Sequence, residues 1–407
     1  MRYRRCRYAA LLAAVIVLVA GCMQKDEETP IPPLSVAGSE AGLGPGTRPL
    51  SLGPGYKGSP SWSPRGDRIA FTVDGYVVDK PVNAPDVRRR TKGDFVAEDV
   101  EWTSESSLTI FGLASGSVAE ARSPVGTDKV SGSVYQARSD EGSPDLKEVA
   151  TEILAMNRGP EGKGLIVVLK RGPYKSRLAL IHDNGVMDRF YTSPIKGRVT
   201  GISLSPDGRR TVLAARPPGD PAPSELHVLD LRVGTHQRIA RLSEDLEILG
   251  APQWTKRGIC YVAGKEEVSG DESVTPLYDL YLIPPGSGTP DPMPGVGEDF
   301  AASSIRVSPD GERLAVVGRL NPNSPTNLYV LDLEAEDLED VMSNEDMEIK
   351  TGSDDLAWSP DGESVAIIAR GAISEQPSVH AGSADTLLEE FYNLYEVPVE
   401  GTARAKR

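Results

Sequence analysis

The sequence predicts an all-β protein, and three observations lead to this prediction. A short turn phrase, Ser-Pro-Asp-Gly or a close variant of it, recurs along the chain. Each copy is followed by a run of apolar residues, which is typical of a buried strand. Helical periodicity is nearly absent, while the 41 glycines and 33 prolines among 407 residues can supply many short turns.

The recurring phrase favours a turn for reasons that follow from its residues. Proline fixes φ at the first central position, Asp can bond to its own backbone, and Gly accepts the left-handed conformation. A type I turn that ends in such a Gly joins two antiparallel strands as a tight hairpin. The four clearest copies are Trp62–Gly66, Leu204–Gly208, Val307–Gly311 and Trp358–Gly362.

Three weaker copies lie in the intervals between the clear ones. We take the first residue of each phrase as its anchor, so the weaker copies are anchored at Trp102, Met156 and Trp254. The seven anchors are 40 to 54 residues apart, which indicates one supersecondary unit repeated along the chain. Each unit also contains a third apolar strand, and several contain a fourth. The predicted third strands are 75–81, 133–140, 177–183, 226–231, 277–284, 328–333 and 394–399.

Four short strands per unit, repeated radially, predict a β-propeller. The seven anchors predict seven four-stranded blades, and six blades are the alternative if the second or third repeat is a distorted insertion. Residues 47–53 have the pattern of a fourth strand without a blade in front of it, and the last repeat ends after its third strand. Pairing these two strands would close the ring and remove its exposed edges. The propeller is therefore predicted at 47–400, followed by a basic tail at 401–407.

The repeat also resembles a known family. The pattern W-S-P-D-G-x-x-(I/L)-A-(F/V), followed by (I/L)-Y-x-x-D-L, is similar to the WD40-like repeats of the TolB-type propeller family, over residues 47–400. The resemblance implies the propeller fold. It implies no particular activity, because the motif residues form turns and core. TolB itself has a second domain before its propeller, and the sequence is expected to lack one.

The N-terminal segment has the pattern of a bacterial lipoprotein signal. Four arginines precede the apolar segment Ala9–Ala20, which is too short to span a bilayer. The stretch Val19–Cys22 resembles a lipobox, which implies that 1–21 is a signal peptide and that Cys22 is acylated, for example with palmitate. A plain secretory signal with an incidental cysteine is the alternative. Because acyl chains hold a protein on a membrane, we predict anchoring in the lipid bilayer through Cys22, on the extracytoplasmic side of the cell membrane.

Composition and charge limit the classes of partner. Residues 22–46 are polar and rich in Pro and Gly, as in a flexible tether. The formal net charge is −15, and loss of the four signal-peptide arginines makes it −15 − 4 = −19. A surface of this sign repels nucleic acid, so we expect no nucleic-acid partner. The basic cluster at 88–92 is interpreted as part of an outer strand, and the oligomeric state is left open.

The sequence offers no recognisable catalytic residues and no metal or cofactor site. None of its four histidines has a second ligand at metal-binding spacing; they are His182, His227, His236 and His380. Cys260 lies inside an apolar run and is predicted to be a buried small hydrophobe. Two acidic segments, 266–272 and 334–348, are interpreted as solvated loops, with a weak calcium site as the alternative. We therefore expect no cofactor.

The repeat geometry predicts which face of the propeller is elaborated. The tight turns between strands one and two lie on one face, and the connections between strands two and three lie on the other. Those connections are longer and irregular, and loops on a rigid scaffold often carry binding. We predict that this loop-rich face, or alternatively the mouth of the central channel, recognises a cell-envelope protein or ligand. The connections are 112–132, 216–224, 264–276, 318–326 and 370–391.

The predicted function is a protein- or ligand-binding scaffold module in the cell envelope, and not an enzyme. One alternative is an extracellular enzyme that processes a saccharide or peptide. Some TolB-like propellers are lyases that bind metal through histidines near the axis, but His182 and His227 are predicted in third strands, away from the channel. A second alternative is an accessory lipoprotein of a membrane sensor or transporter.

Overall fold

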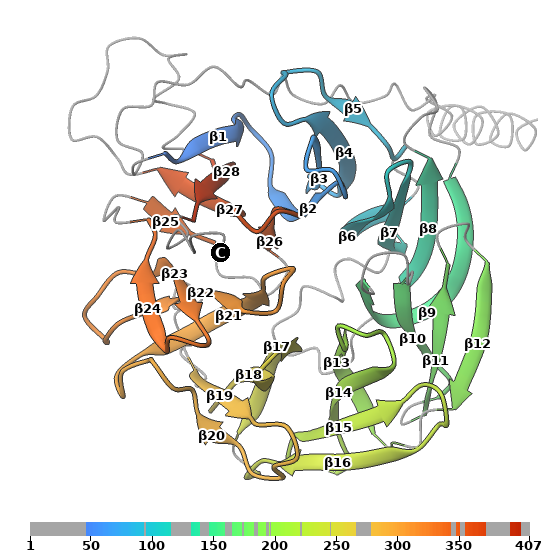
Figure 1. The fold of residues 1–407 in the computed structure, drawn as a ribbon. Helices are drawn as coiled ribbons and strands as arrows, with labels where there is room; N and C mark the ends of the chain where they lie inside the picture. The colour runs from blue at the N-terminus through green and yellow to red at the C-terminus, as the bar shows by residue number, and fades with distance from the viewer. Residues whose placement is uncertain are drawn as a thin grey trace, which may run out of the picture. The chain divides into compact units, whose positions relative to one another are not determined.

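The computed structural model shows β-sheets arranged in a circle around a central axis, as Figure 1 shows. The chain divides into two units, Met1–Pro32 and Pro33–Arg407, and everything described below belongs to the second. The described residues are 46–399, except for 93–94, 115–131, 139–145, 159–164, 173–174, 183–185, 193–194, 196, 220–221, 245, 266–277, 343–346, 351–354 and 372–390. The predicted signal peptide, Cys22, most of the tether and the basic tail lie outside these residues.

Four of the six sheets are four-stranded antiparallel blades in simple chain order. The first contains β2 (Lys57–Trp62), β3 (Arg68–Val73), β4 (Tyr76–Pro81) and β5 (Arg88–Arg89). Another contains β13 (Arg198–Leu204), β14 (Arg210–Arg216), β15 (Glu225–Asp230) and β16 (His236–Arg241). The next contains β17 (Glu247–Thr255), β18 (Gly258–Gly264), β19 (Asp279–Ile283) and β20 (Asp291–Pro292). The fourth contains β21 (Ala301–Val307), β22 (Arg313–Arg319), β23 (Asn327–Asp332) and β24 (Asp337–Asp340).

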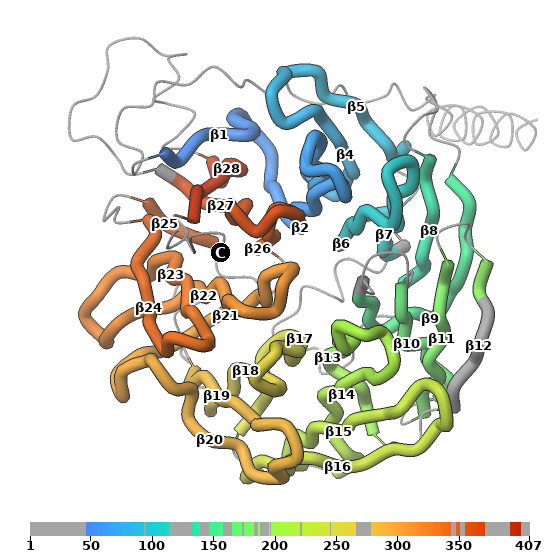
Figure 2. Tube along the Cα trace, viewed as in Figure 1, coloured from blue at the N-terminus to red at the C-terminus, as the bar shows by residue number. Residues whose placement is uncertain are grey.

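The two ends of the propeller meet in one sheet, which confirms the predicted closure. This sheet contains β1 (Arg48–Ser51), β25 (Met347–Ile349), β26 (Leu356–Trp358), β27 (Ser364–Gly371) and β28 (Asn393–Pro398). Strand β1 pairs antiparallel with β28, and Figure 2 shows the first and last strands side by side. The buried ammonium group of Lys57 donates to the carbonyl oxygen of Gly53 at 2.6 Å, and that of Lys80 donates to Leu50 at 2.8 Å. The closing segment is thus held by strand pairing and by two buried lysines.

The sixth sheet contains the strands of two repeats. Its seven strands are β6 (Phe95–Ser104), β7 (Ser107–Ala114), β8 (Gly132–Arg138), β9 (Leu146–Arg158), β10 (Leu165–Lys170), β11 (Ser176–Ile181) and β12 (Met187–Thr192). The first part of β9 pairs with β8 as a fourth strand, and its last part pairs with β10 as the first strand of the next repeat. The prediction of seven separate blades is therefore wrong, and the alternative of six holds.

The sequence of β9 explains why the two repeats share a sheet. No Gly or Pro interrupts residues 146–158, so nothing ends the strand where one repeat should pass to the next. The strand changes its pairing partner from β8 to β10 near Glu152. The φ of Glu152 is left-handed, at 57°, and the register with β8 shifts close to this residue. An irregularity of this kind bends a strand and increases its twist. A single bent strand therefore takes the place of the loop expected between the fourth strand of one repeat and the first strand of the next.

The Ser-Pro-Asp-Gly turns have the predicted conformation. Their glycines all have left-handed φ values, between 64° and 75° at the four clear copies. In the third clear copy the Ser308 Oγ accepts the backbone N–H of Arg313 at 2.9 Å and donates to Asp310 Oδ1 at 2.5 Å. Asp310 in turn accepts the N–H of Glu312, which is the predicted bond to nearby backbone. The Ser side chain thereby fastens both sides of the hairpin.

Several smaller predictions are also settled by the described strands. Part of the basic cluster, Arg88–Arg89, forms the outer strand β5, as predicted. The cluster is not solvated throughout, because Arg90 is buried and pairs with Asp79. The acidic segment 334–348 is more ordered than the solvated loop we expected, because it contains β24 and the start of β25. The segment 266–272 lies outside the described residues. Within the described part of the chain, no helix has the length and apolar character needed to cross a membrane.

Candidate functional site: a polar ring at the channel mouth

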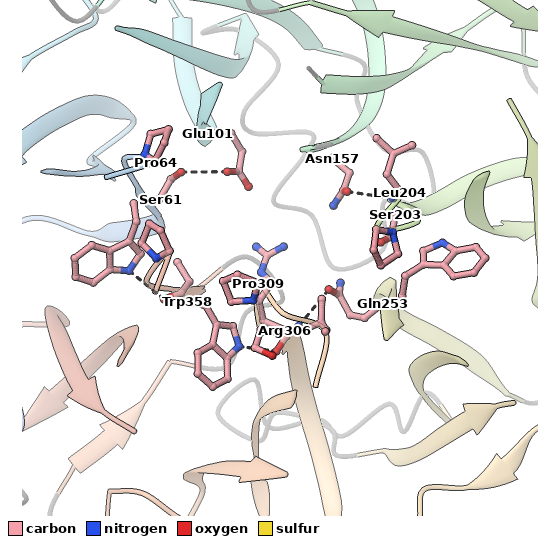
Figure 3. A pocket seen from close by; sticks show the side chains of 18 of the residues that line it. Ser61, Pro64, Glu101, Asn157, Ser203, Leu204, Gln253, Arg306, Pro309 and Trp358 are labelled. Atoms are coloured by element: carbon pink, nitrogen blue, oxygen red, sulfur yellow. Dashed lines mark hydrogen bonds between the residues drawn. The ribbon is translucent and has the colours of Figure 1, made fainter. Parts of the chain in front are cut away.

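A cavity of about 420 Å³ lies at one end of the central channel. Its lining comes from the first strands of all seven repeats and from the turns that follow several of them, as Figure 3 shows. Those first strands are β2, β6, β9, β13, β17, β21 and β26, and most of them contact the next around the ring. Prolines of the Ser-Pro-Asp-Gly turns line the cavity, so it opens on the face that carries these turns.

The seven repeats each place one equivalent residue at this mouth. In β2 the anchor Trp62 pairs with Ile69, and the residue before the anchor, Ser61, lines the cavity. The same register holds in the other repeats, with the preceding residue at the cavity each time. We call these seven residues the polar ring: Ser61, Glu101, Asn157, Ser203, Gln253, Arg306 and Ala357.

The register also corrects one predicted anchor. Leu165 begins the strand after the third turn and pairs with Arg158, as Ile69 pairs with Trp62. Arg158 is therefore the anchor of the third repeat, two residues after the predicted Met156. Asn157 then occupies the ring position. The error arose because this repeat lacks the Ser-Pro-Asp-Gly phrase. Without it, the position of the turn, and so of the anchor residue before it, could not be assigned from the sequence.

Side-chain oxygens of the ring join neighbouring first strands. Ser61 Oγ accepts the backbone N–H of Trp102, the next anchor along the chain, at 3.0 Å. The same bond recurs from Leu204 to Asn157 Oδ1 at 3.4 Å and from Val307 to Gln253 Oε1 at 3.5 Å. Buried backbone N–H groups need partners, so three ring residues have a structural role in holding adjacent blades together.

Two ring residues, Arg306 and Glu101, have charged groups that these strand-joining hydrogen bonds do not use. Arg306 donates through Nε to the carbonyl oxygen of Leu356 at 3.2 Å. Glu101 accepts the Ser61 hydroxyl through Oε2 at 3.1 Å. Among the described residues, neither the Nη groups of Arg306 nor Oε1 of Glu101 has a hydrogen-bond or ion-pair partner. Both side chains are half-buried and point into the opening in Figure 3.

An apolar rim surrounds these polar groups. Four turn prolines line the outer part of the cavity, at positions 64, 206, 309 and 360. The indoles of Trp62, Trp254 and Trp358 line it as well, although each is less than one-tenth exposed. A mainly apolar wall with a few placed polar groups is the usual composition of a small-molecule site, and the volume lies in the usual range. The arrangement can bind a ligand and orient it through its charges.

The residues that the sequence singled out lie elsewhere. His227 lies in the third strand β15, as predicted, and its Nε2 is 3.1 Å from Glu225. Burial lowers the pKa of His227, and the bond to Glu225 opposes that shift. His182 follows the third strand β11, and His236 begins the outer strand β16. None of these three lines the cavity, and the described residues contain no group of three metal-binding side chains. His380 lies outside the described residues.

Cys260 is confirmed as a buried hydrophobe. It lies in β18 with no exposed surface, and burial raises the pKa of its thiol to about 12. A thiol with such a pKa is a poor nucleophile near neutral pH. No motif in the sequence marks the polar ring directly. The available signal was strand alternation: the residue before each anchor must face away from the anchor side chain, and so toward the channel.

The predicted loop-rich face is opposite the cavity and remains a prediction. Of its connections, 318–326 is fully described and 216–224 is described except for 220–221. The other three lie largely outside the described residues. The cavity therefore places a second candidate binding surface on the face that the sequence suggested was plain.

Comparison with solved structures supports the fold. No protein-family model and no curated protein matches the chain. The β-propeller domain of the Trilobed protease from Pyrococcus furiosus is 10% identical, with a TM-score of 0.54 over 84% of this chain and 95% of that one. An oligogalacturonate lyase from Vibrio parahaemolyticus is 13% identical, with a TM-score of 0.53 over 90% of this chain and 96% of that one.

A putative TolB from Agrobacterium tumefaciens is among the matching structures too. It is 12% identical, with a TM-score of 0.42 over 76% of this chain and 88% of that one. At the identities of the first two structures, the likeness establishes an all-β propeller fold and nothing about substrate or partner.

Proposed function

We propose that this chain is a membrane-anchored extracytoplasmic lipoprotein whose propeller binds a small ligand at the polar ring. The observation that supports binding is the cavity itself, to which every repeat contributes one equivalent residue. The charged groups of Arg306 and Glu101 are left over after the structural hydrogen bonds are made. Anchoring through Cys22 keeps the module at the cell surface, where the loop-rich face can contact an envelope protein.

Filling the cavity should abolish ligand binding. Ala357 is a half-buried ring residue with the smallest side chain of the seven, so Ala357→Phe places an aromatic ring at the channel mouth. The full chain is screened by saturation-transfer NMR against amino acids, short peptides, nucleosides, phosphates and oligosaccharides. We expect solutes that bind the wild type to lose their signal with Ala357→Phe. Product formed from a bound solute would instead favour the alternative of a processing enzyme.

The matched control is Ala335→Phe, which adds the same ring at an exposed position in the turn between β23 and β24. This variant should bind the same solutes as the wild type. If no solute binds, or if Ala357→Phe binds as the wild type does, the polar ring is not a binding site.

The anchor has a separate test. In cells grown with radiolabelled palmitate, the wild-type chain should be labelled and should sediment with membranes. Cys22→Ala should lose the label, because the sequence offers Cys22 as the acylated residue at the end of an apolar segment. Cys260→Ala is the control and should be labelled normally, since Cys260 is buried. Equal labelling of the Cys22 variant and the wild type would refute the anchor without affecting the cavity.

A further inference from the structure

We infer that the polar ring recognises a zwitterion, a ligand with one free ammonium and one free carboxylate, of amino-acid or short-peptide chemistry. This inference rests on the proposed binding function and specifies its ligand. It follows from the two leftover charges, which have opposite sign and belong to different repeats. Glu101 lies in β6 and Arg306 lies in β21.

Arg306 supplies the site for the carboxylate. Its Nε is fixed by the carbonyl oxygen of Leu356, so the plane of the guanidinium is held from one side. Its backbone is fixed as well, because the Trp358 indole N–H donates to the Arg306 carbonyl oxygen at 2.9 Å. The remaining Nη groups can donate in parallel to two oxygens of a carboxylate, and such paired charge-assisted bonds are among the strongest in proteins.

Glu101 supplies the site for the ammonium. One carboxylate oxygen is held by the Ser61 hydroxyl, which orients the group. The other oxygen has no partner within the described part of the chain, and the side chain points into the opening. A partly buried carboxylate gains most from a cationic ligand that it can also hydrogen-bond. An ammonium group meets both conditions.

The charge balance of the ring argues against other ligand classes. Its seven residues include one anion and one cation, so the formal charge of the ring is zero. A phosphate, a nucleotide or a chain of uronic acids would bring more negative charge than Arg306 can balance, and Glu101 would repel it. A neutral sugar would leave both charges without partners. A zwitterion satisfies both of them.

The remaining lining suits the body of a peptide. The carboxamide of Asn157 lines the cavity, and it joins the strands through its oxygen, which accepts the backbone N–H of Leu204. Its nitrogen is a donor. It can donate to a peptide carbonyl. The turn prolines at 64, 206, 309 and 360 offer apolar surface for side chains. The site thus combines two charged groups with an apolar rim.

The experiment uses L-alanine, Ala-Ala and Ala-Ala-Ala, each as the free form, the N-acetylated form and the C-terminal amide. Binding to the full wild-type chain is measured by titration calorimetry or NMR. At least one free form should bind, and blocking either of its ends should weaken binding about tenfold or more, because each charged hydrogen bond lost has that effect. The three lengths distinguish an amino acid from a peptide as the preferred ligand.

Two variants assign the two ends. Glu101→Gln should remove the preference for a free amine and keep the preference for a free carboxylate. Arg306→Gln should do the reverse. Arg306→Lys, which keeps the charge but not the fork, should restore part of the carboxylate preference and guards against misfolding of the first variant. The controls are Arg65→Gln and Glu105→Gln, an exposed ion pair 3.6 Å apart on the same face that does not line the cavity.

Failure of this inference can be distinguished from failure of the proposed function. If the free and blocked forms bind equally, or if none of them binds while another solute binds the wild type and not Ala357→Phe, the ring is a binding site for a different ligand and the zwitterion inference is wrong. If the Arg65 and Glu105 controls change the end preferences as the ring variants do, the effect is not due to the ring.

Discussion

Asp79→Ala should lower the free energy of unfolding by about 3–5 kcal/mol, because it leaves the buried guanidinium of Arg90 and the partly buried guanidinium of Arg68 without their shared carboxylate. Asp79 in β4 is fully buried and accepts from Arg68 Nε at 2.8 Å, while its other oxygen accepts from Arg90. Arg90 is itself almost fully buried. Denaturant unfolding of the full chain, followed by tryptophan fluorescence, measures the loss.

The control for this prediction is Glu312→Ala. Glu312 pairs with Lys256 at 2.8 Å, but both side chains are substantially exposed. An exposed pair contributes less than about 1 kcal/mol. If both variants are destabilised to the same extent, burial of the Asp79 cluster is not what makes it important. The cluster lies in the same blade as Ser61, so its loss should also disturb the polar ring.

Raising the pH from 8 to 9.5 should stabilise the wild type relative to Lys57→Met/Lys80→Met. Burial lowers the pKa of each lysine from 10.5 to about 8. Between these values the unfolded chain binds more protons than the folded chain, so the free energy of unfolding rises with pH. The cost of burying the charge is present below pH 8 and is relieved above it. For two fully buried lysines the expected relative gain is on the order of 3 kcal/mol.

Other titratable groups also change the free energy of unfolding with pH. Their contributions cancel when the double variant is compared with the wild type, because both proteins contain them. The thiol of Cys260 has a raised pKa of about 12 and loses stability in the opposite direction above pH 9, but it is present in both proteins. The single variant Lys57→Met should show about half of the difference. Lys256→Met, at an exposed lysine, should show none. A flat difference between the wild type and the double variant would mean that both lysines keep ordinary pKa values in the fold.

The turns and the fold class could be predicted because their causes are local. Ser308, Asp310 and Gly311 form their hydrogen bonds and left-handed backbone within six residues, so four copies of the phrase were sufficient to place four hairpins. The closing strand was predictable as well, since a ring with a missing outer strand at one end and a spare strand at the other has one simple solution. These features need no knowledge of distant contacts.

The polar ring and the shared strand could not be predicted in the same way. The ring position is chemically different in every repeat, so no repeated letter marks it, and its seven residues meet only when segments about 50 residues apart close into a circle. The course of β9 depends on the left-handed φ of Glu152, a residue that seldom adopts it. Met156 was taken as an anchor because the turn after it lacks the phrase.

The shared strand also determines how the chain can lose its structure and how it can change in length. Where repeats touch through side chains across a seam, each can open with some independence of its neighbour. The second and third repeats are instead joined by backbone hydrogen bonds on both edges of β9, so we expect them to unfold together as one cooperative unit. A deletion of one repeat is conceivable elsewhere in the circle. At β9, by contrast, we expect that a shortened chain would have to lose the second and third repeats together.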